Sequence, residues 1–189
     1  MKNSIRNQLS IALLACLLPL ALNAAIPPKV GEKVPDFALT TLDDQTVRLS
    51  DLTPKGNVVL VVLRGWPGYQ CPICTRQVQD YIKSASVLAE AKAQVVMVYP
   101  GPADDLKAHA KDFLGSKDWP KDFLFVMDPA FSMVNAYGLR WDAPNETSYP
   151  ATFVLDRKGM VRFAKISHSH GERTKAADIV KELDCLHDE

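Results

Sequence analysis

Apolar residues along the chain follow two alternating patterns, one typical of buried strands and the other of helices. Residues 58–63 are consecutive and apolar, mostly β-branched, which is typical of a strand buried on both faces. Between Cys71 and Ala89, apolar residues recur at the spacing of one helix face. The same alternation predicts further strands over residues 94–99, 123–127, 151–155 and 161–166, and helices over residues 104–114, 129–137 and 176–186.

Two shorter apolar segments precede this region. Residues 37–39 and 46–49 flank the turn formers Asp43 and Asp44, a combination typical of a β-hairpin. The order of elements, a hairpin followed by alternating strands and helices, predicts an α/β domain. No long linker, low-complexity segment or repeat interrupts it.

The N-terminal residues have a different character from the rest. Two basic residues precede an apolar run over residues 11–22, and small residues follow at Ala24 and Ala25. This is the pattern of a secretory signal peptide, and the run is too short for a membrane-spanning helix. We therefore expect residues 1–25 to be removed, leaving one domain over residues 26–189 in the periplasm or outside the cell.

An alternative interpretation keeps the N-terminus attached to a membrane. Leu14-Ala15-Cys16 resembles a lipobox, which would leave Cys16 as a lipid anchor. The apolar run continues past Cys16 to Leu22, which a lipoprotein signal does not need, so removal without an anchor is favoured. No later segment of the sequence is long and apolar enough to cross a membrane.

The composition is that of a globular protein and narrows the classes of partner. Lys and Arg total 22, as do Asp and Glu, so the formal net charge of +0 gives no electrostatic reason to expect nucleic acid. Four Cys in 189 residues are too few for a domain held together by disulfides. Three of them, Cys71, Cys74 and Cys185, follow the signal peptide.

The segment Cys71-Pro-Ile-Cys74 follows a strand and a Gly- and Pro-rich loop and begins a helix. A helix N-terminus presents unpaired N–H groups and the positive end of the helix dipole, both of which favour a thiolate. Two intervening residues put the second sulfur one turn away, within reach of a disulfide. This context favours redox chemistry over a structural disulfide, which would close almost no loop. It also argues against a zinc site, which needs further ligands at metal spacing.

Three segments resemble the peroxiredoxin-like family of the thioredoxin-fold superfamily (alkyl hydroperoxide reductase/thiol-specific antioxidant, or redoxin, type). They are residues 31–37 (Gly-Glu-Lys-Val-Pro-Asp-Phe), residues 67–77 (Pro-Gly-Tyr-Gln-Cys-Pro-Ile-Cys-Thr-Arg-Gln), and residues 151–156 with Gly159. The resemblance covers nearly all of residues 30–186. It implies a thioredoxin-like fold, with a central mixed sheet flanked by helices and an N-terminal hairpin extension. It also implies a thiol-dependent oxidoreductase that needs no cofactor or metal.

Carried over residue by residue, the resemblance puts Cys74 on the position of the peroxidatic cysteine and Cys71 on that of a Thr. Pro67 and Thr75 match the Pro and Thr of the same motif. Where the family carries an Arg that supports the thiolate and the peroxide, this chain has Pro150. The bond before Pro150 instead resembles the cis-proline of thioredoxins and periplasmic thiol reductases, where the backbone lies beside the redox sulfur.

In a thioredoxin-like sheet, several strand ends meet at the edge that holds the two sulfurs. The loops that we expect to surround them cover residues 64–70, 99–103, 138–149 and 167–173. Arg64 is a candidate to stabilise a thiolate or a leaving hydroxide, and Arg140 is a candidate to bind substrate. A surface position is the alternative for each.

Three further residues have chemistry of their own. His168 and His170 are compatible with a copper or zinc site, with proton donation, or with a solvated loop, which is the simplest interpretation. Cys185 lies off the apolar face of the last helix and resembles a C-terminal resolving cysteine. Cys71 beside Cys74 makes that role redundant.

Three hypotheses about function follow. In the leading one, an exported enzyme reduces hydroperoxides: the Cys74 thiolate becomes a sulfenic acid, Cys71 condenses with it, and a thioredoxin-like partner reduces the disulfide. In the second, Cys71 attacks protein disulfides and Cys74 resolves the mixed disulfide. In the third, both cysteines and a loop His bind copper in a metallochaperone, although related copper proteins usually have three residues between the cysteines.

Overall fold

The uninterrupted apolar run of the sequence forms β3 (Asn57–Val62) in the interior of the sheet. β3 pairs in parallel with β4 (Ala93–Pro100) on one side and antiparallel with β6 (Ala151–Leu155) on the other. Its side chains from Val58 to Val62 are fully buried, because helices cover both faces of the sheet. This burial explains why no polar residue interrupts the run.

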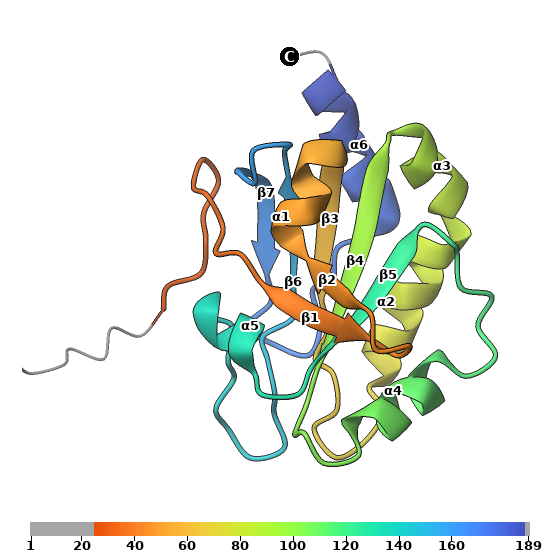
Figure 1. Ribbon diagram of the computed structural model, residues 1–189, viewed down its shortest axis with the longest axis vertical. Coiled ribbons are helices and arrows are strands. Elements are labelled where there is room, and N and C mark those ends of the chain that lie inside the picture. The colour runs from red at the N-terminus through yellow and green to blue at the C-terminus, as the bar shows by residue number, and fades with distance from the viewer. Residues whose placement is uncertain (1–24, 188–189) are drawn as a thin grey trace, which may run out of the picture.

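The computed structural model describes residues 25–187, in which seven strands form one sheet in the order β2-β1-β5-β4-β3-β6-β7 (Figure 1). The other strands are β1 (Ala38–Thr41), β2 (Thr46–Arg48), β5 (Phe123–Asp128) and β7 (Val161–Ile166). β3, β4 and β5 run parallel, and the remaining pairings are antiparallel, so the sheet is mixed. The hairpin of β1 and β2 extends the sheet beyond β5.

Two cores lie on opposite faces of the sheet. The helices are α1 (Leu49–Leu52), the 3-10 turn η1 (Thr53–Lys55), α2 (Pro72–Lys83), α3 (Ala85–Glu90), α4 (Leu106–Leu114), α5 (Ser132–Ala136) and α6 (Ala176–His187). α2, α4 and α6 pack in the core that contains Val59 and Val61, and this core includes Cys71 and Cys74. α1 and α5 pack in the core that contains Val58 and Leu60. Because successive side chains of a strand point to opposite faces, β3 contributes to both.

This architecture confirms the predicted α/β fold with a central mixed sheet and an N-terminal hairpin. Strand β6 runs antiparallel to β3, as expected. The long helix expected up to Ala89 is divided, because Ser84 leaves the helical backbone (φ −100°, ψ 10°) and its N–H closes on the carbonyls of Asp80 and Tyr81. The short helix α1 was not predicted from the sequence.

The predicted signal peptide and the lipobox cysteine Cys16 lie outside the described residues. Within residues 25–187, no helix combines the length and the apolar character needed to cross a membrane.

Candidate thiol active site

The path of the chain from β3 to α2 depends on a glycine. Gly65 has a φ of +71°, and a Cβ atom there would lie 1.8 Å from the carbonyl oxygen of Pro100, at the end of β4. Glycine alone tolerates this combination of positive φ and close backbone approach. The N–H of Trp66 donates to the same carbonyl at 2.9 Å. The loop therefore turns back along the end of the sheet and brings Cys71 to the start of α2.

Cys71 caps the N-terminus of α2 with its sulfur. The sulfur accepts a hydrogen bond from the N–H of Cys74 at 3.3 Å, which satisfies one of the amides that the first helical turn leaves unpaired. The carbonyl of Cys71 accepts from both the N–H and the hydroxyl of Thr75. Thr75, predicted as a supporting residue, therefore fixes the first turn. The two cysteines are free thiols with exposed fractions of 3% and 1%.

The two sulfurs differ in acidity. The hydrogen bond from the Cys74 thiol lowers the pKa of Cys71 to about 5, with help from the N–H groups of Cys74 and Ile73 and from the charge of Arg173, and against the effect of burial. The pKa of Cys74 is raised well above its ordinary value, because its proton is shared with Cys71 and because burial and the nearby Cys71 charge disfavour a second anion. These surroundings favour the thiolate at Cys71 over the thiolate at Cys74.

Arg64, predicted to stabilise a thiolate or a leaving hydroxide, is held by the neighbouring loops. Its Nε donates to Glu146 at 2.5 Å, Nη1 to the Tyr69 hydroxyl at 2.5 Å and Nη2 to the Asn145 carbonyl at 2.7 Å. Burial lowers the pKa of Arg64, but the hydrogen bonds to Glu146 and Tyr69 outweigh it and raise the pKa overall. The side chain thus serves the loops, whereas the backbone N–H of Arg64 lowers the pKa of Cys74.

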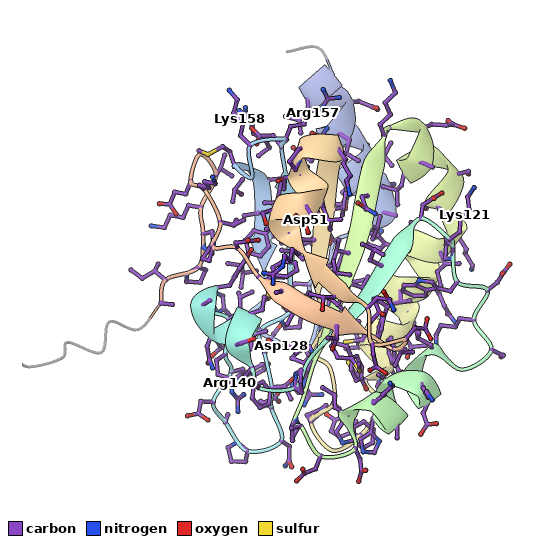
Figure 2. All side chains as sticks on the ribbon, in the orientation of Figure 1. Asp51, Lys121, Asp128, Arg140, Arg157 and Lys158 are labelled. Atoms are coloured by element: carbon purple, nitrogen blue, oxygen red, sulfur yellow. The ribbon has the colours of Figure 1, made fainter. Side chains whose placement is uncertain are left out.

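Arg140, predicted to bind substrate, shapes the loop before β6. Figure 2 shows it at the end of the sheet away from Arg157 and Lys158. Its Nη1 donates to the carbonyls of Trp141 and Thr147 at 2.6 Å, and its guanidinium lies 4.3 Å from the ring centre of Phe131. The Nη1 group of Arg140 is therefore directed to carbonyls of its own loop.

Pro67, the first residue of the family motif, lines a cavity of about 300 Å³ between the two loops. The other residues that line it are Trp66, Gly68, Pro102, Phe131, Arg140, Asn145, Glu146 and Thr147. Most of these residues belong to the two loops that Arg64 and Arg140 contact, residues 64–70 and 138–149. The cavity therefore lies between the loop that precedes the thiol pair and the loop before β6.

The prediction of a cis bond before Pro150 is wrong. Residues 25–187 contain no cis peptide bond, so Pro150 follows a trans bond. The carbonyl of Pro150 accepts from the N–H of Ser167 at 2.8 Å, and the N–H of Tyr149 donates to Leu139 at 2.8 Å. The trans form is the cheaper by about 0.5–1 kcal/mol for a bond before proline. Here it also leads the chain into β6 with both flanking groups hydrogen-bonded.

Arg173 is a charged residue near the sulfurs whose importance the sequence did not reveal. Its positive charge acts to lower the pKa of both Cys71 and Cys74. Its Nη1 donates to the carbonyl of Gly171 at 2.5 Å, whereas its Nε and Nη2 are buried and have no partner among the described residues. The one signal in the sequence was the expected return of residues 167–173 to the thiol edge.

Comparisons with known proteins agree with this arrangement. The Redoxin family profile matches residues 29–181. The chain belongs to the Redoxin family. Its resemblance to peroxiredoxins, inferred from the sequence motifs, is thereby confirmed.

Curated relatives fall into two groups. The chain is 28% identical to peroxiredoxin Bcp of Bacillus subtilis over 137 residues, which are 69% of this chain and 80% of that protein. It is 29% identical to the chloroplastic peroxiredoxin Q of Triticum aestivum over 133 residues, 70% of this chain but 57% of that protein. It is 27% identical to the thiol-disulfide oxidoreductase ResA of Geobacillus thermodenitrificans, over 70% of this chain and 67% of that protein. These relatives identify the chain as a thiol-dependent oxidoreductase.

Solved structures share the fold. Reduced Prx3 from Vibrio vulnificus in complex with H2O2 superposes with a TM-score of 0.67 at 19% identity, over 85% of this chain and 99% of that chain. Peroxidoxin BcpB from Mycobacterium tuberculosis superposes with a TM-score of 0.65 at 22% identity, over 84% and 98%. The predicted thioredoxin-like fold of the peroxiredoxins is confirmed by these matches.

His168, His170 and Cys185 are the other residues singled out from the sequence. His170 Nε2 lies 2.7 Å from Glu146 Oε1, and the ring of His168 lies 5.0 Å from that of Tyr149. Residues 25–187 contain no group of three or more His, Cys, Asp or Glu side chains placed to hold a metal ion, so the copper alternative gains no support. Cys185 is exposed on α6, nine residues beyond Ala176 and thus about 14 Å further along the helix.

Proposed function

We propose that this Redoxin protein is an exported peroxidase that reduces hydroperoxides with the Cys71–Cys74 pair, and that Cys71 is the sulfur that attacks. The observation that carries the proposal is the sulfur of Cys71 at the N-terminus of α2, with its pKa lowered to about 5 beside a Cys74 thiol whose pKa is raised. A thiolate is the reactive form of cysteine, and a retained proton on the neighbour serves the second step. This assignment exchanges the roles that the family motif gives to the two cysteines.

The reaction balances with the groups present. The Cys71 thiolate attacks one oxygen of the hydroperoxide, the O–O bond breaks, and the other oxygen leaves as an alkoxide or hydroxide that takes a proton from solvent. Cys71 is then a sulfenic acid. The sulfur of Cys74 attacks that of Cys71 while its proton passes to the departing OH, so that water leaves and a disulfide forms. A dithiol protein of thioredoxin type would restore both thiols by exchange.

The burial of the pair supports a small oxidant. Cys71 has an exposed fraction of 3%, so a hydroperoxide group can approach its sulfur more easily than a disulfide in a folded protein can. The cavity beside Pro67 could accept the organic part of such a molecule.

Reduction of disulfides is the second candidate, because the order of the two pKa values also suits it. An acidic first cysteine and a protonated second one are what thiol–disulfide exchange requires, and the relative ResA is by name a thiol-disulfide oxidoreductase. The same attacking sulfur, Cys71, would serve both reactions.

Stopped-flow oxidation of the reduced protein distinguishes the two substrates. We expect a hydroperoxide to oxidise the pair faster than a small disulfide does, and Cys71→Ser to abolish the reaction. In Cys74→Ser, Cys71 should accumulate as a sulfenic acid that a dimedone probe labels. Faster oxidation by the disulfide would favour the second candidate, and a sulfenic acid at Cys74 in Cys71→Ser would restore the roles that the motif implies.

Export has its own test. We propose that residues 1–25 are removed on export and that residues 26–189 form the mature domain. The intact chain, expressed in a bacterium, should appear in the periplasmic fraction with an N-terminus after Ala24 or Ala25. Cys16→Ser should leave this processing unchanged, whereas loss of processing in that variant would favour the lipoprotein.

A further inference from the structure

The two unpaired nitrogens of Arg173 are an exception among the buried polar groups of the chain. Buried N–H groups in proteins nearly always have partners, because an unpaired one costs about 1–3 kcal/mol. Yet Nε and Nη2 of Arg173 are buried with none among the described residues. Arg64, at the same edge of the sheet, has a partner for each of its three nitrogens.

The neighbouring residues hold Arg173 against α2. The Thr174 hydroxyl lies 3.1 Å from that of Tyr81 in α2 and 2.6 Å from that of Thr152 in β6. The N–H of Ala176 donates to the Asp80 carboxylate at 2.7 Å. These contacts join the segment before α6 to the same helix whose first turn carries the cysteines, so the placement of Arg173 follows from the fold.

A second unpaired group lies on this face of α2. Gln77 is three residues after Cys74 and four before Tyr81, so the three share one face of the helix. Its side chain is buried, and its Oε1 has no partner among the described residues. Gln77 therefore places a free acceptor on the face of α2 between the cysteines and Tyr81, whose hydroxyl contacts Thr174, the residue after Arg173.

We propose that Arg173 is the catalytic cation of the thiol pair, and that with Gln77 it binds the hydroperoxide group of the substrate. This inference rests on the proposed function. A hydroperoxide has one O–H donor and oxygen acceptors, which match the free amide oxygen of Gln77 and the two unpaired nitrogens of Arg173. The O–H donates to Gln77 Oε1, while Nε and Nη2 of Arg173 donate to the oxygen that leaves.

The charge of Arg173 assists at both stages of the first step. Before the attack it favours the thiolate of Cys71. As the O–O bond breaks, negative charge passes from sulfur to the leaving oxygen, and preorganised donors there stabilise the transition state. Arg64, the other arginine at this edge of the sheet, is engaged with Glu146. Arg173 would therefore supply this function from a different element, the segment before α6.

The test compares Arg173→Gln with Arg173→Lys and with Arg76→Gln as a matched control. Arg76 is exposed on α2, two residues from Cys74, so its replacement removes one charge near the thiols without entering the site. Ultraviolet titration of the thiolate in the reduced proteins should show the pKa of Cys71 rising by about one unit in Arg173→Gln, as expected for the loss of a nearby opposite charge. Arg173→Lys and Arg76→Gln should keep the acidic value.

Rates at neutral pH separate thiolate formation from transition-state binding. The second-order rate of oxidation by a hydroperoxide should fall about 100-fold in Arg173→Gln, the effect of losing a preorganised donor. Alkylation by iodoacetamide, which needs only the thiolate, should change little. Gln77→Leu should weaken hydroperoxide binding and leave the titration unchanged.

Two results would overturn the proposal. One is an Arg173→Gln variant that is folded, by circular dichroism, and equal to Arg76→Gln in both titration and peroxide rate. The other is an equal loss with iodoacetamide and with hydroperoxide, which would limit Arg173 to thiolate formation. If the wild type reacts only with disulfides, the proposed function fails, while the titration still reports whether Arg173 acts on Cys71.

Discussion

Two arginines at the thiol edge of the sheet have opposite surroundings. Arg64, just after β3, pairs with the nearly buried carboxylate of Glu146, and each of its three nitrogens has a partner in the loops. Arg173, before α6, has two buried nitrogens without one among the described residues. From the sequence, Arg64 was the candidate for the sulfur and Arg173 was one charge in a polar loop. The hydrogen bonds exchange the two candidates: Arg64 is occupied by the loops, and Arg173 has nitrogens free to act beside the sulfur.

The difference is one of free energy. A guanidinium whose every nitrogen donates to a protein group stabilises those groups and has fewer N–H groups left for a substrate. A buried guanidinium with free donors lowers the stability of the folded state, so its retention beside two thiols indicates a role in function. Replacements of the two arginines should therefore act on different properties: the free energy of unfolding for Arg64, and the acidity and reactivity of Cys71 for Arg173.

Arg64→Ala should have the largest effect on folding. It would leave Glu146 as an unpaired, nearly buried carboxylate, and removal of one partner from a buried pair costs about 3–5 kcal/mol. Urea denaturation of the reduced protein measures this loss, with Arg76→Ala as the control for an exposed arginine. A loss below about 1 kcal/mol, the range of exposed pairs, would remove the contrast between the two arginines.

Thr174→Val should have an intermediate effect on stability, and it should change both the unfolding free energy and the pKa of Cys71. It removes the shared partner of the Tyr81 and Thr152 hydroxyls, which should cost about 1–3 kcal/mol in unfolding free energy. Because it loosens the segment that holds Arg173, the pKa of Cys71 should also rise. Thr46→Val, the same change at an exposed position of β2, is the control. A destabilised variant with an unchanged thiol titration would show that Arg173 is placed independently of Thr174.

Arg173→Met should leave the unfolding free energy unchanged or raise it by up to about 1 kcal/mol, because it removes two buried donors that have no protein partner. The same variant should lose thiolate at mildly acidic pH, where the wild type, with a Cys71 pKa of about 5, retains it. Denaturation and iodoacetamide alkylation measured side by side test this opposition. A loss of stability comparable to that of Arg64→Ala would identify Arg173 as structural.

The sequence predicted those parts of the fold that depend on local patterns. The apolar run of β3 and the Cys-Pro-Ile-Cys start of α2 can be recognised because their neighbours in sequence carry the signal. The break at Ser84 was missed, since its apolar spacing continues across it. That several loops meet at one edge of the sheet was predicted from the order and direction of the strands. The structure confirms this strand order.

The hydrogen-bonded pairs of side chains at that edge could not be predicted, because the two residues of each pair are far apart in the sequence. Arg64 and Glu146 are 82 residues apart, and Tyr81 and Thr174 are 93 apart. Arg173 follows Gly171 and Glu172, a polar context that is typical of solvated loops. The next residue, Thr174, is held by hydrogen bonds that form only once α2 and β6 have packed.

His170→Ala should have the smallest effect on the unfolding free energy. It removes the contact to Oε1 of Glu146, the oxygen that Arg64 does not bind. His170 Nε2 lies 2.7 Å from Oε1, but the ring is half-exposed, and exposed contacts of this kind contribute about 0–1 kcal/mol. Oε2 keeps its bond to Arg64 in this variant, so the loop should remain in place. Added salt should remove the small difference in unfolding free energy, because it screens surface charges more than buried ones. A large, salt-insensitive loss would mean that His170, rather than Arg64, holds the Glu146 loop, and the contrast between the two arginines would then have to be drawn elsewhere.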